Sequence, residues 1–176
     1  MLFFAYIILY FCIYSILGWI CETIFCYITN EKGKRGFLSG PYCPIYGVGG
    51  VLICYLLIPF TANFLLIFVL SALIASVLEY FTGYVLETAF EQKWWDYSHR
   101  KYNLKGRVCL GNSILFGIMG VIAVYFIHPI IVDIVANLGN VYVLIFAIIV
   151  SIMFIYDTIM TLKKLQVNEI TNLTPE

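Results

Sequence analysis

Four acidic residues of this 176-residue chain stand within or beside long apolar segments, where a charge is costly and usually faces the protein interior. They are Glu22, Glu79, Glu87 and Asp157. With a helical rise of about 1.5 Å per residue, Glu79 lies about 24 Å along its span and is still within a hydrocarbon core of ~30 Å. Such a carboxylate must be protonated or paired, with Arg35, Arg107 or a tyrosine hydroxyl as candidate partners. This depth favours a function in binding a cation or a proton, whereas Asp157 is interpreted as an interfacial residue.

A second group of candidate residues lies in one polar stretch, KWWDYSHRKYNLKGRVCLGNS, from Lys93 to Ser113. It contains five of the ten Lys and Arg residues and two of the three Trp residues. Trp and Tyr are typical of the headgroup level of a membrane, and a guanidinium suits a carboxylate or a phosphate. We therefore expect this stretch to cap a substrate-binding pocket, with the candidate residues Trp94, Trp95, Asp96, Tyr97, Asn103 and Arg107.

Glu22 and Glu87 are each followed by an arginine just before the next apolar segment, Arg35 and Arg107 respectively. Two interpretations of these pairs remain open. Each pair could hold two helices together as a structural contact. Alternatively, the four residues could surround a cytoplasm-facing polar pocket that binds a ligand or a proton.

Membrane helices are the elements that must position these residues. The chain is 62% hydrophobic and 11% charged, with a mean hydropathy of +0.96, whereas soluble domains are about half apolar and a quarter charged. The predicted fold class is therefore all-α, a polytopic membrane protein with five transmembrane helices in a single domain, residues 1–165. The five apolar segments run from Leu2 to about Ile28, Pro44 to Phe60, Asn63 to Phe90, Leu110 to Ile131 and Val141 to about Leu162.

The distribution of basic residues predicts the orientation. The connections PFTAN (59–63) and DIVANLGN (133–140) contain no Lys or Arg, so a five-span topology places all ten basic residues on one side. Positively charged connections stay in the cytoplasm. We therefore expect a multi-pass protein of the cell (cytoplasmic) membrane with its N-terminus outside, its C-terminus inside and residues 166–176 as a cytoplasmic tail.

The first four spans contain an internal repeat. GWICETIF (18–25) matches GYVLETAF (83–90), NEKGKRGFL (30–38) resembles NLKGRVCL (103–110), and IYGVGG (45–50) matches LFGIMG (115–120). The constant order predicts a parallel duplication of a helix-loop-helix unit, at about residues 10–60 and 75–131, plus one extra helix at about 141–162. Small residues let helix backbones approach closely in lipid, so helix contacts are expected at Gly47, Gly50, Gly117 and Gly120.

The six cysteines and two histidines do not predict a metal site. No two cysteines form a C-x-x-C pair, and neither histidine has metal-ligand spacing with them. His99 is interpreted as a solvated loop residue and His128, beside Pro129, as a residue of the outer membrane interface. We expect no metal, no cofactor and, because the net charge is zero, no nucleic-acid partner.

Several long blocks also carry a resemblance to a known family: GWICETIF, RGFLSGPYCPIYGVGG, EYFTGYVLETAF and WWDYSHRKYNLKGRVCLGNSILFG. Over roughly residues 10 to 125, they resemble the ABC-transporter type IV (CmpB-like) permeases, a family of small bacterial membrane proteins. The resemblance implies a transport-type protein. It also implies a separate ATPase subunit for any ABC role, since the chain has no G-x-x-x-x-G-K-[ST] loop to bind nucleotide.

Three functional hypotheses follow. The first is a permease or substrate-binding subunit in the lipid bilayer, with a cytoplasm-facing site of Glu, Arg and Trp residues. The second is an intramembrane enzyme acting on a lipid or lipid-linked substrate at the inner leaflet, with Glu22, Glu87 or Asp96 as acid/base candidates. The sequence shows no recognisable nucleophile–base pair, which favours a non-enzymatic role. The third is a non-catalytic membrane partner subunit, and the small interior of five spans favours a homodimer for the first two.

Overall fold

The computed structural model of the protein describes residues 1–29 and 36–173. Arg35, one of the candidate site residues, lies outside the described residues. The elements in chain order are α1 (Leu2–Thr29), α2 (Pro44–Leu57), the 3-10 turn η1 (Ile58–Phe60), α3 (Phe64–Phe90), β1 (Asn103–Leu104), β2 (Val108–Cys109), α4 (Leu110–Ile122), the π-helical turn η2 (Ala123–Ile127), α5 (His128–Asn137) and α6 (Asn140–Leu173). The predicted all-α fold is therefore confirmed except for a short antiparallel hairpin, β1–β2.

Four helical segments of the described chain are long and apolar enough to cross a membrane: Leu2–Ile28, Phe64–Phe90, Leu110–Asn137 and Asn140–Gln166. The remaining predicted span, Pro44–Phe60, is a shorter apolar helix. Two predicted helix ends were too early. The fourth span continues past Ile131 to Asn137, and α6 continues past Leu162 to Leu173. Hydropathy detects the apolar part of a helix, whereas good helix formers such as Lys, Leu and Gln extend α6 into its polar part.

A π-helical turn explains how the fourth span passes its proline. Pro129 has no backbone N–H to donate to the carbonyl four residues earlier, at Tyr125. The wider turn η2, which contains Tyr125, lies at this point. The helix therefore continues from α4 into α5 instead of ending before Pro129.

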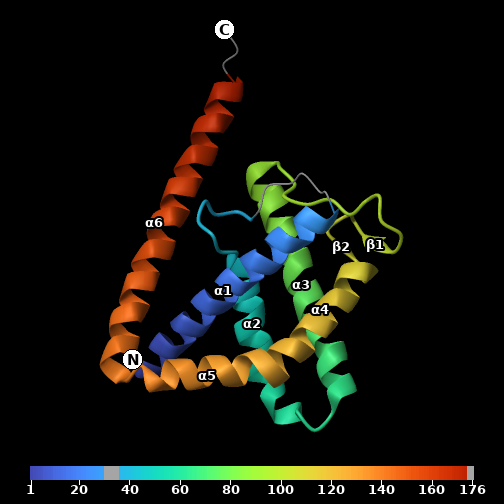
Figure 1. Cartoon of the computed structure of the whole chain (residues 1–176). Helices are drawn as coiled ribbons and strands as arrows, with labels where there is room; N and C mark the ends of the chain where they lie inside the picture. The colour runs from blue at the N-terminus through green and yellow to red at the C-terminus, as the bar shows by residue number, and fades with distance from the viewer. Residues whose placement is uncertain (30–35, 174–176) are drawn as a thin grey trace.

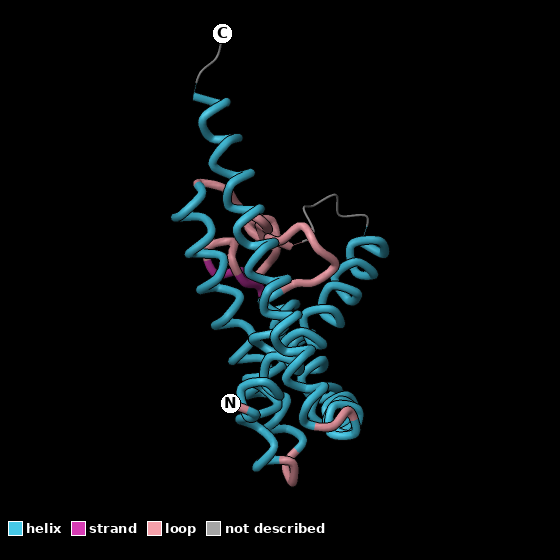
Figure 2. The backbone as a smooth tube through the Cα atoms, turned by 90° about the vertical axis from the view of Figure 1, so that its left-hand side faces the viewer, coloured by secondary structure: helices cyan, strands magenta, loops and turns pink. Residues whose placement is uncertain are grey.

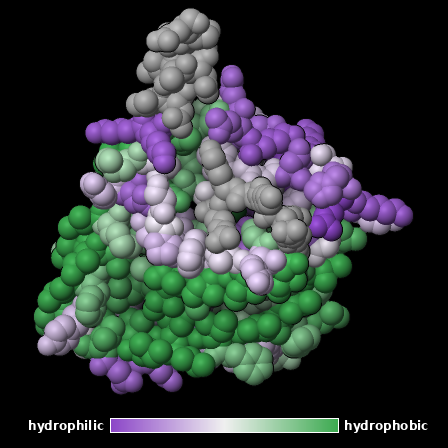
Figure 3. Space-filling model, turned by 45° about the horizontal axis from the view of Figure 1, so that its top comes forward, coloured by the Kyte–Doolittle hydropathy of each residue, from purple (hydrophilic) through white to green (hydrophobic). Residues whose placement is uncertain are grey.

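Figure 1 shows that α1, α2, α3, α4 and α6 run alternately up and down, whereas α5 runs across the molecule at the end that carries the N-terminus. α1 and α3 run away from the end that carries the N-terminus, α2 and α4 run back, and α6 returns along one side. The connections 36–43 and 91–109 and the C-terminus thus lie at one end, and the turns at 61–63 and 138–139 lie at the other (Figures 1 and 2). Figure 3 shows that the first of these ends is polar and that a broad hydrophobic band lies below it.

Glycines allow the close contacts within each helix pair, as the sequence predicts. A Cβ atom added to Gly47 of α2 would lie 2.2 Å from Ser15 Oγ and 2.6 Å from the Phe11 carbonyl oxygen of α1. A Cβ atom on Gly120 of α4 would lie 2.2 Å from Ser71 of α3. Such distances are below any van der Waals contact, so these positions cannot hold a side chain without a shift of the helices.

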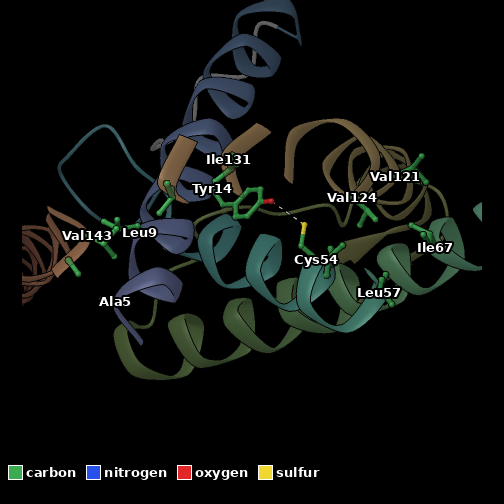
Figure 4. Close-up of a cluster of buried hydrophobic side chains, with 13 residues drawn as sticks. Ala5, Leu9, Tyr14, Cys54, Leu57, Ile67, Val121, Val124, Ile131 and Val143 are labelled. Atoms are coloured by element: carbon green, nitrogen blue, oxygen red, sulfur yellow. Dashed lines mark hydrogen bonds between the residues drawn. The ribbon is translucent and has the colours of Figure 1, made fainter. Parts of the chain in front are cut away.

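The apolar core occupies the half of the molecule near the N-terminus (Figure 4). It joins the first half of α1, the second half of α2, the beginning of α3, and residues of α4, η2, α5 and α6. Its buried members are Ala5, Leu9, Tyr14, Ile53, Cys54, Leu57, Ile67, Val121, Val124, Ile131, Val135, Val143 and Ala147. The other half of the molecule, toward the polar connections, contains the cavity described next.

Candidate functional site

A cavity of about 1100 Å³ lies among α1, α2, α3, α4 and the connection that follows α3. Its deep wall is apolar and includes Leu17, Ile53, Leu78, Met119 and Ile127. Its polar lining comes from the helix ends and the connection, and consists of Glu22, Tyr46, Glu79, Gln92, Lys93, Trp94, Trp95, Asp96, Tyr97 and Asn112. The cavity is therefore amphipathic, with polar groups gathered near the polar end of the molecule.

Glu79 enters this cavity from α3 and is buried, with 6% of its surface exposed. The Tyr97 hydroxyl donates to its Oε1 atom over 3.1 Å. Its Oε2 atom is also buried and has no hydrogen-bond partner among the described residues. Of the partners considered from the sequence, the structure shows the tyrosine hydroxyl, whereas Arg107 lies with another carboxylate. Glu79 thus lines the cavity and has one buried oxygen without a hydrogen bond, and the Asn112 side chain of α4 lies beside the same carboxylate.

Tyr97 is held as a donor by its surroundings. Burial, followed by the neighbouring Glu79 carboxylate, raises the pKa of the Tyr97 phenol. Its backbone N–H donates to the Gly106 carbonyl over 2.8 Å, which attaches Tyr97 to the later part of the connection 91–109. The Tyr97 hydroxyl therefore stays protonated and donates to Glu79 at physiological pH.

Glu22 reaches the same cavity from α1. It accepts a hydrogen bond from the hydroxyl of Tyr46 on α2. Gly18, one turn earlier on α1, makes this contact possible, because a Cβ atom there would lie 2.2 Å from the Cβ atom of Tyr46. The cavity is thus lined by one carboxylate from each helix pair, and each carboxylate has a tyrosine donor.

Glu87 and Arg107 form a separate ion pair outside this cavity. Arg107 Nη2 lies 2.7 Å and Nε 2.9 Å from Glu87 Oε2. The guanidinium also donates to Tyr80 over 3.2 Å and lies over the ring of Tyr84 at 5.1 Å. The hydrogen bond to Glu87 raises the pKa of Arg107. These contacts attach the connection after α3 to the end of α3, as the structural interpretation of this pair expects.

The two tryptophans stand between the cavity and this ion pair. Both line the cavity, and both also line a small pocket of about 10 Å³ beside Glu87 and Arg107. Trp95 Nε1 donates to the Arg107 carbonyl over 2.9 Å. Trp94 packs against Phe37 and Phe90, with ring centroids 5.7 Å apart in both cases. The rings therefore form part of the cavity wall and are fixed by contacts with the connections.

Asp96 and Asn103 shape the connection itself. Asp96 Oδ1 accepts from the Ser98 N–H over 2.9 Å, and Asp96 Oδ2 lies 3.2 Å from Lys93 Nζ. The backbone hydrogen bond from Ser98 lowers the pKa of Asp96. The Asn103 amide donates to the carbonyls of Ser98 and Arg100, and its oxygen accepts from the Gly106 N–H. Asp96 also lines the cavity, whereas Asn103 does not.

Asp157 fastens α6 to the connection before α2. Its Oδ2 atom accepts from the Gly40 N–H over 3.0 Å and from the Tyr42 hydroxyl over 2.7 Å. Burial, followed by the hydrogen bond to Asp157, raises the pKa of Tyr42. The carboxylate therefore has a structural role at the polar end, in agreement with its interpretation as an interfacial residue.

His128, interpreted from the sequence as an outer-interface residue, makes contacts with α1 that the sequence did not predict. Its Nδ1 atom lies 2.9 Å from the Tyr14 hydroxyl, which in turn lies 3.1 Å from Cys54 Sγ in the apolar core. The ring of Tyr10 packs edge-on against His128 at 5.6 Å. These contacts attach the start of α5 to α1.

Tyr46 and Asn112 were missed from the sequence as cavity residues. Tyr46 lies in the IYGVGG block directly before Gly47, so its position beside a helix contact was a usable signal. Asn112 lies in the first turn of α4 and has no comparable signal. In residues 1–29 and 36–173, no group of three or more His, Cys, Asp and Glu side chains could hold a metal ion.

The sequence model of a family described as "Putative ABC-transporter type IV" matches residues 9–162. The chain belongs to this family. The match extends into α6, as far as residue 162, which the sequence blocks alone did not reach. Family membership and the four long apolar helices together identify a multi-pass membrane protein of transporter type. No curated protein and no solved structure matches the chain.

Proposed function

We propose that this chain is the membrane subunit of a transporter and that its substrate binds in the cavity between the two helix pairs. The observation that carries the proposal is Glu79, a buried carboxylate that has one oxygen without a hydrogen bond and that lines a cavity of about 1100 Å³. An ionisable group in a membrane span that is neither ion-paired nor exposed is typical of a site on a substrate or proton pathway. Glu22, Trp94, Trp95 and Tyr97 complete the binding surface.

The proposed orientation places the cavity on the cytoplasmic side. The described chain has seven basic residues, and they lie in the connection 91–109 and in the C-terminal part of α6, at the polar end of the molecule. Basic connections are retained in the cytoplasm. The N-terminus is then outside, the C-terminus inside, and Pro44–Phe60 crosses the membrane as a fifth span at the short limit of about 17 residues.

The helix directions support a parallel repeat. α1 and α2 form one up-and-down pair and α3 and α4 form another, and both pairs start at the N-terminal end (Figure 1). Parallel repeats are known among transporters, with the substrate site at the interface between them. Superposition of α1–α2 on α3–α4 by a rotation about the membrane normal tests this duplication, with Glu22 placed on Glu87.

ATP coupling requires a second protein in this proposal. The sequence contains no G-x-x-x-x-G-K-[ST] loop, so an ATPase subunit would bind at the cytoplasmic end, where the polar connections lie. Co-purification from the cell membrane tests for this subunit. Light scattering after size-exclusion chromatography tests for a homodimer, which the small interior of one chain favours.

The decisive experiment is Glu79→Gln in cells that lack the native gene. The substitution keeps the shape of the side chain and removes its charge, so it should abolish complementation of the deletion phenotype while the protein inserts and purifies normally. Asp133→Asn on α5 is the matched control, because Asp133 is exposed and lies in the part of the fourth span that leads to the N-terminal end. Full complementation by Glu79→Gln would remove the cavity from the transport pathway.

The purified wild-type and Glu79→Gln proteins also distinguish a transporter from an enzyme. A transporter is stabilised by its substrate without converting it. An enzyme of the inner leaflet would change components of a purified lipid extract, which mass spectrometry detects. Turnover that disappears in Glu79→Gln would replace the transport proposal with an enzymatic one.

A further inference from the structure

We propose that the cavity binds an amphipathic cation, meaning a positively charged organic group joined to a bulky apolar body. This inference rests on the proposed function, because it assigns a substrate class to the same cavity. It depends on four features of the lining: its charge, its free hydrogen-bonding capacity, its aromatic rings and its apolar wall.

The charge of the lining is negative. Four charged side chains of the described residues line the cavity, namely Glu22, Glu79, Lys93 and Asp96. Lys93 and Asp96 lie 3.2 Å apart and neutralise each other. Glu22 and Glu79 remain, and neither contacts a basic side chain among the described residues. An anionic group would be repelled by them, whereas a cation would be attracted.

At the two carboxylates of the lining, the remaining hydrogen-bonding capacity is that of an acceptor. Tyr46 and Tyr97 already donate their hydroxyl protons to Glu22 and Glu79. Glu79 Oε2 stays buried and unpaired. A buried acceptor without a donor costs free energy, and a cationic ligand at this oxygen would remove that cost. The unpaired oxygen is therefore the expected contact for the positive group.

Aromatic rings surround the same region. Trp94, Trp95, Tyr46 and Tyr97 all line the cavity. The face of a tryptophan or tyrosine ring attracts a cation, and rings of this kind form the sites that recognise organic ammonium groups. Because contacts with the connections fix both tryptophans, these rings are in place before a ligand arrives.

The apolar wall determines the rest of the ligand. Beyond the carboxylates, the cavity is lined by side chains such as Leu17, Ile53, Leu78, Met119 and Ile127. Its volume of about 1100 Å³ is at the upper end of typical ligand sites, which are about 300–1000 Å³. A small hydrated cation would leave this wall uncovered. A cation with hydrophobic rings or a chain fits both parts of the site.

Two sources could supply such a ligand, and they share this chemistry. One is a hydrophobic cation from the cytoplasm, and the other is the amine of a membrane lipid. Tetraphenylphosphonium serves as the probe for the shared chemistry, and tetraphenylborate is its matched anion with nearly the same size and shape. Binding to the full-length protein in dodecyl maltoside micelles can be followed by equilibrium dialysis.

We expect saturable binding of tetraphenylphosphonium and none of tetraphenylborate. Glu79→Gln and Glu22→Gln should each weaken binding about tenfold, since each removes a charge-assisted contact. Glu79→Asp keeps the charge and should retain more binding than Glu79→Gln, and Asp133→Asn should bind as the wild type does. Melting temperatures close to that of the wild type show that the variants are folded. Equal binding of both probes, or unchanged binding by both Gln variants, overturns the inference.

Nanodiscs separate the two sources. If a lipid amine occupies the cavity, discs containing phosphatidylethanolamine should weaken tetraphenylphosphonium binding relative to discs of phosphatidylglycerol alone. Equal binding in both discs assigns the cavity to a cation from the cytoplasm. The outcome for the proposed function is independent: loss of complementation by Glu79→Gln, together with no binding of tetraphenylphosphonium by the wild type, would retain the transport site and reject the amphipathic cation.

Discussion

Glu22 and Glu87 occupy the same position in two matching sequence blocks, yet the structure gives them different surroundings. Glu22 faces the large cavity and accepts a hydrogen bond from Tyr46. Glu87 lies outside that cavity and is paired with Arg107 at 2.7 Å. One carboxylate is thus available to a ligand, and its counterpart is neutralised within the protein.

The difference follows from the connection after each helix. After α3, the connection carries the hairpin β1–β2, which brings Arg107 back over the end of α3. At the start of α2, Tyr46 lies against Gly18 and contacts Glu22 directly. Matching sequences therefore indicate equivalent positions on the helices, but the partner of a side chain depends on the connection that faces it.

The largest effect on stability is expected at the glycine contacts within each helix pair, α1–α2 and α3–α4. Gly47→Ala would place a methyl group 2.6 Å from a backbone carbonyl oxygen of α1, whereas the methyl of Gly117→Ala would meet the movable ring of Phe68. We expect a loss of about 3 kcal/mol for Gly47→Ala and about 1 kcal/mol for Gly117→Ala in the free energy of unfolding. Unfolding in mixed micelles measures both values. Gly111→Ala is the control, because no atom lies within 4 Å of its added Cβ.

The next effect tests the neutralised carboxylate. Arg107→Met leaves Glu87 partly buried without its partner and should lower the melting temperature by roughly 5 °C. The double variant Arg107→Met with Glu87→Gln should recover part of this loss, because the unpaired charge is gone. Lys163→Met, an exposed position of α6, should have no effect. A fall in the double variant as large as in the single one would mean that the contacts with Tyr80 and Tyr84 dominate.

A smaller effect is expected for the carboxylate that faces the cavity. Tyr46→Phe removes the hydrogen bond to Glu22 but leaves the ring that packs against Gly18. Since water in the cavity can replace the lost donor, we expect a loss of about 1 kcal/mol in the free energy of unfolding. Chemical unfolding monitored by circular dichroism measures it. A loss larger than that of Gly47→Ala would mean that the hydrogen bond is essential for holding α1 and α2 together.

The smallest effect on stability is expected at Asp96, in the connection 91–109 between α3 and α4. The hydrogen bond from the Ser98 N–H lowers the pKa of Asp96 below its ordinary value of about 4. The stabilisation is then present above pH of about 4 and is lost as the pH falls through the lower pKa of the folded protein. Asp96→Asn should remove this part of the pH dependence of the melting temperature. Identical profiles for wild type and variant would show that this hydrogen bond does not stabilise the fold.

The sequence predicted those features that depend on composition and spacing along one helix. The apolar segments, the burial of Glu79 and the close helix contacts at Gly47 and Gly120 are of this kind. It predicted some positions of close contact between helices, but it did not predict which side chains meet at the contacts of α2 and α5 with α1. The Tyr46–Glu22 contact depends on the packing of α2 on α1, and the contact of His128 with Tyr14 depends on the packing of α5 on α1.

The attachment of α6 has a consequence for the biogenesis of the protein. α6 packs on α1 at the edge of the bundle, follows a turn in which Gly139 has a φ of +77°, and accepts hydrogen bonds at Asp157 from Gly40 and Tyr42. The ribosome delivers α6 after α1 to α5. Until it inserts, the Gly40 N–H and the Tyr42 hydroxyl lack their acceptor. The segment ahead of α2 therefore reaches its final form only after α6 has been synthesised, and a nascent chain arrested at Gly139 would still contain an unfinished polar end.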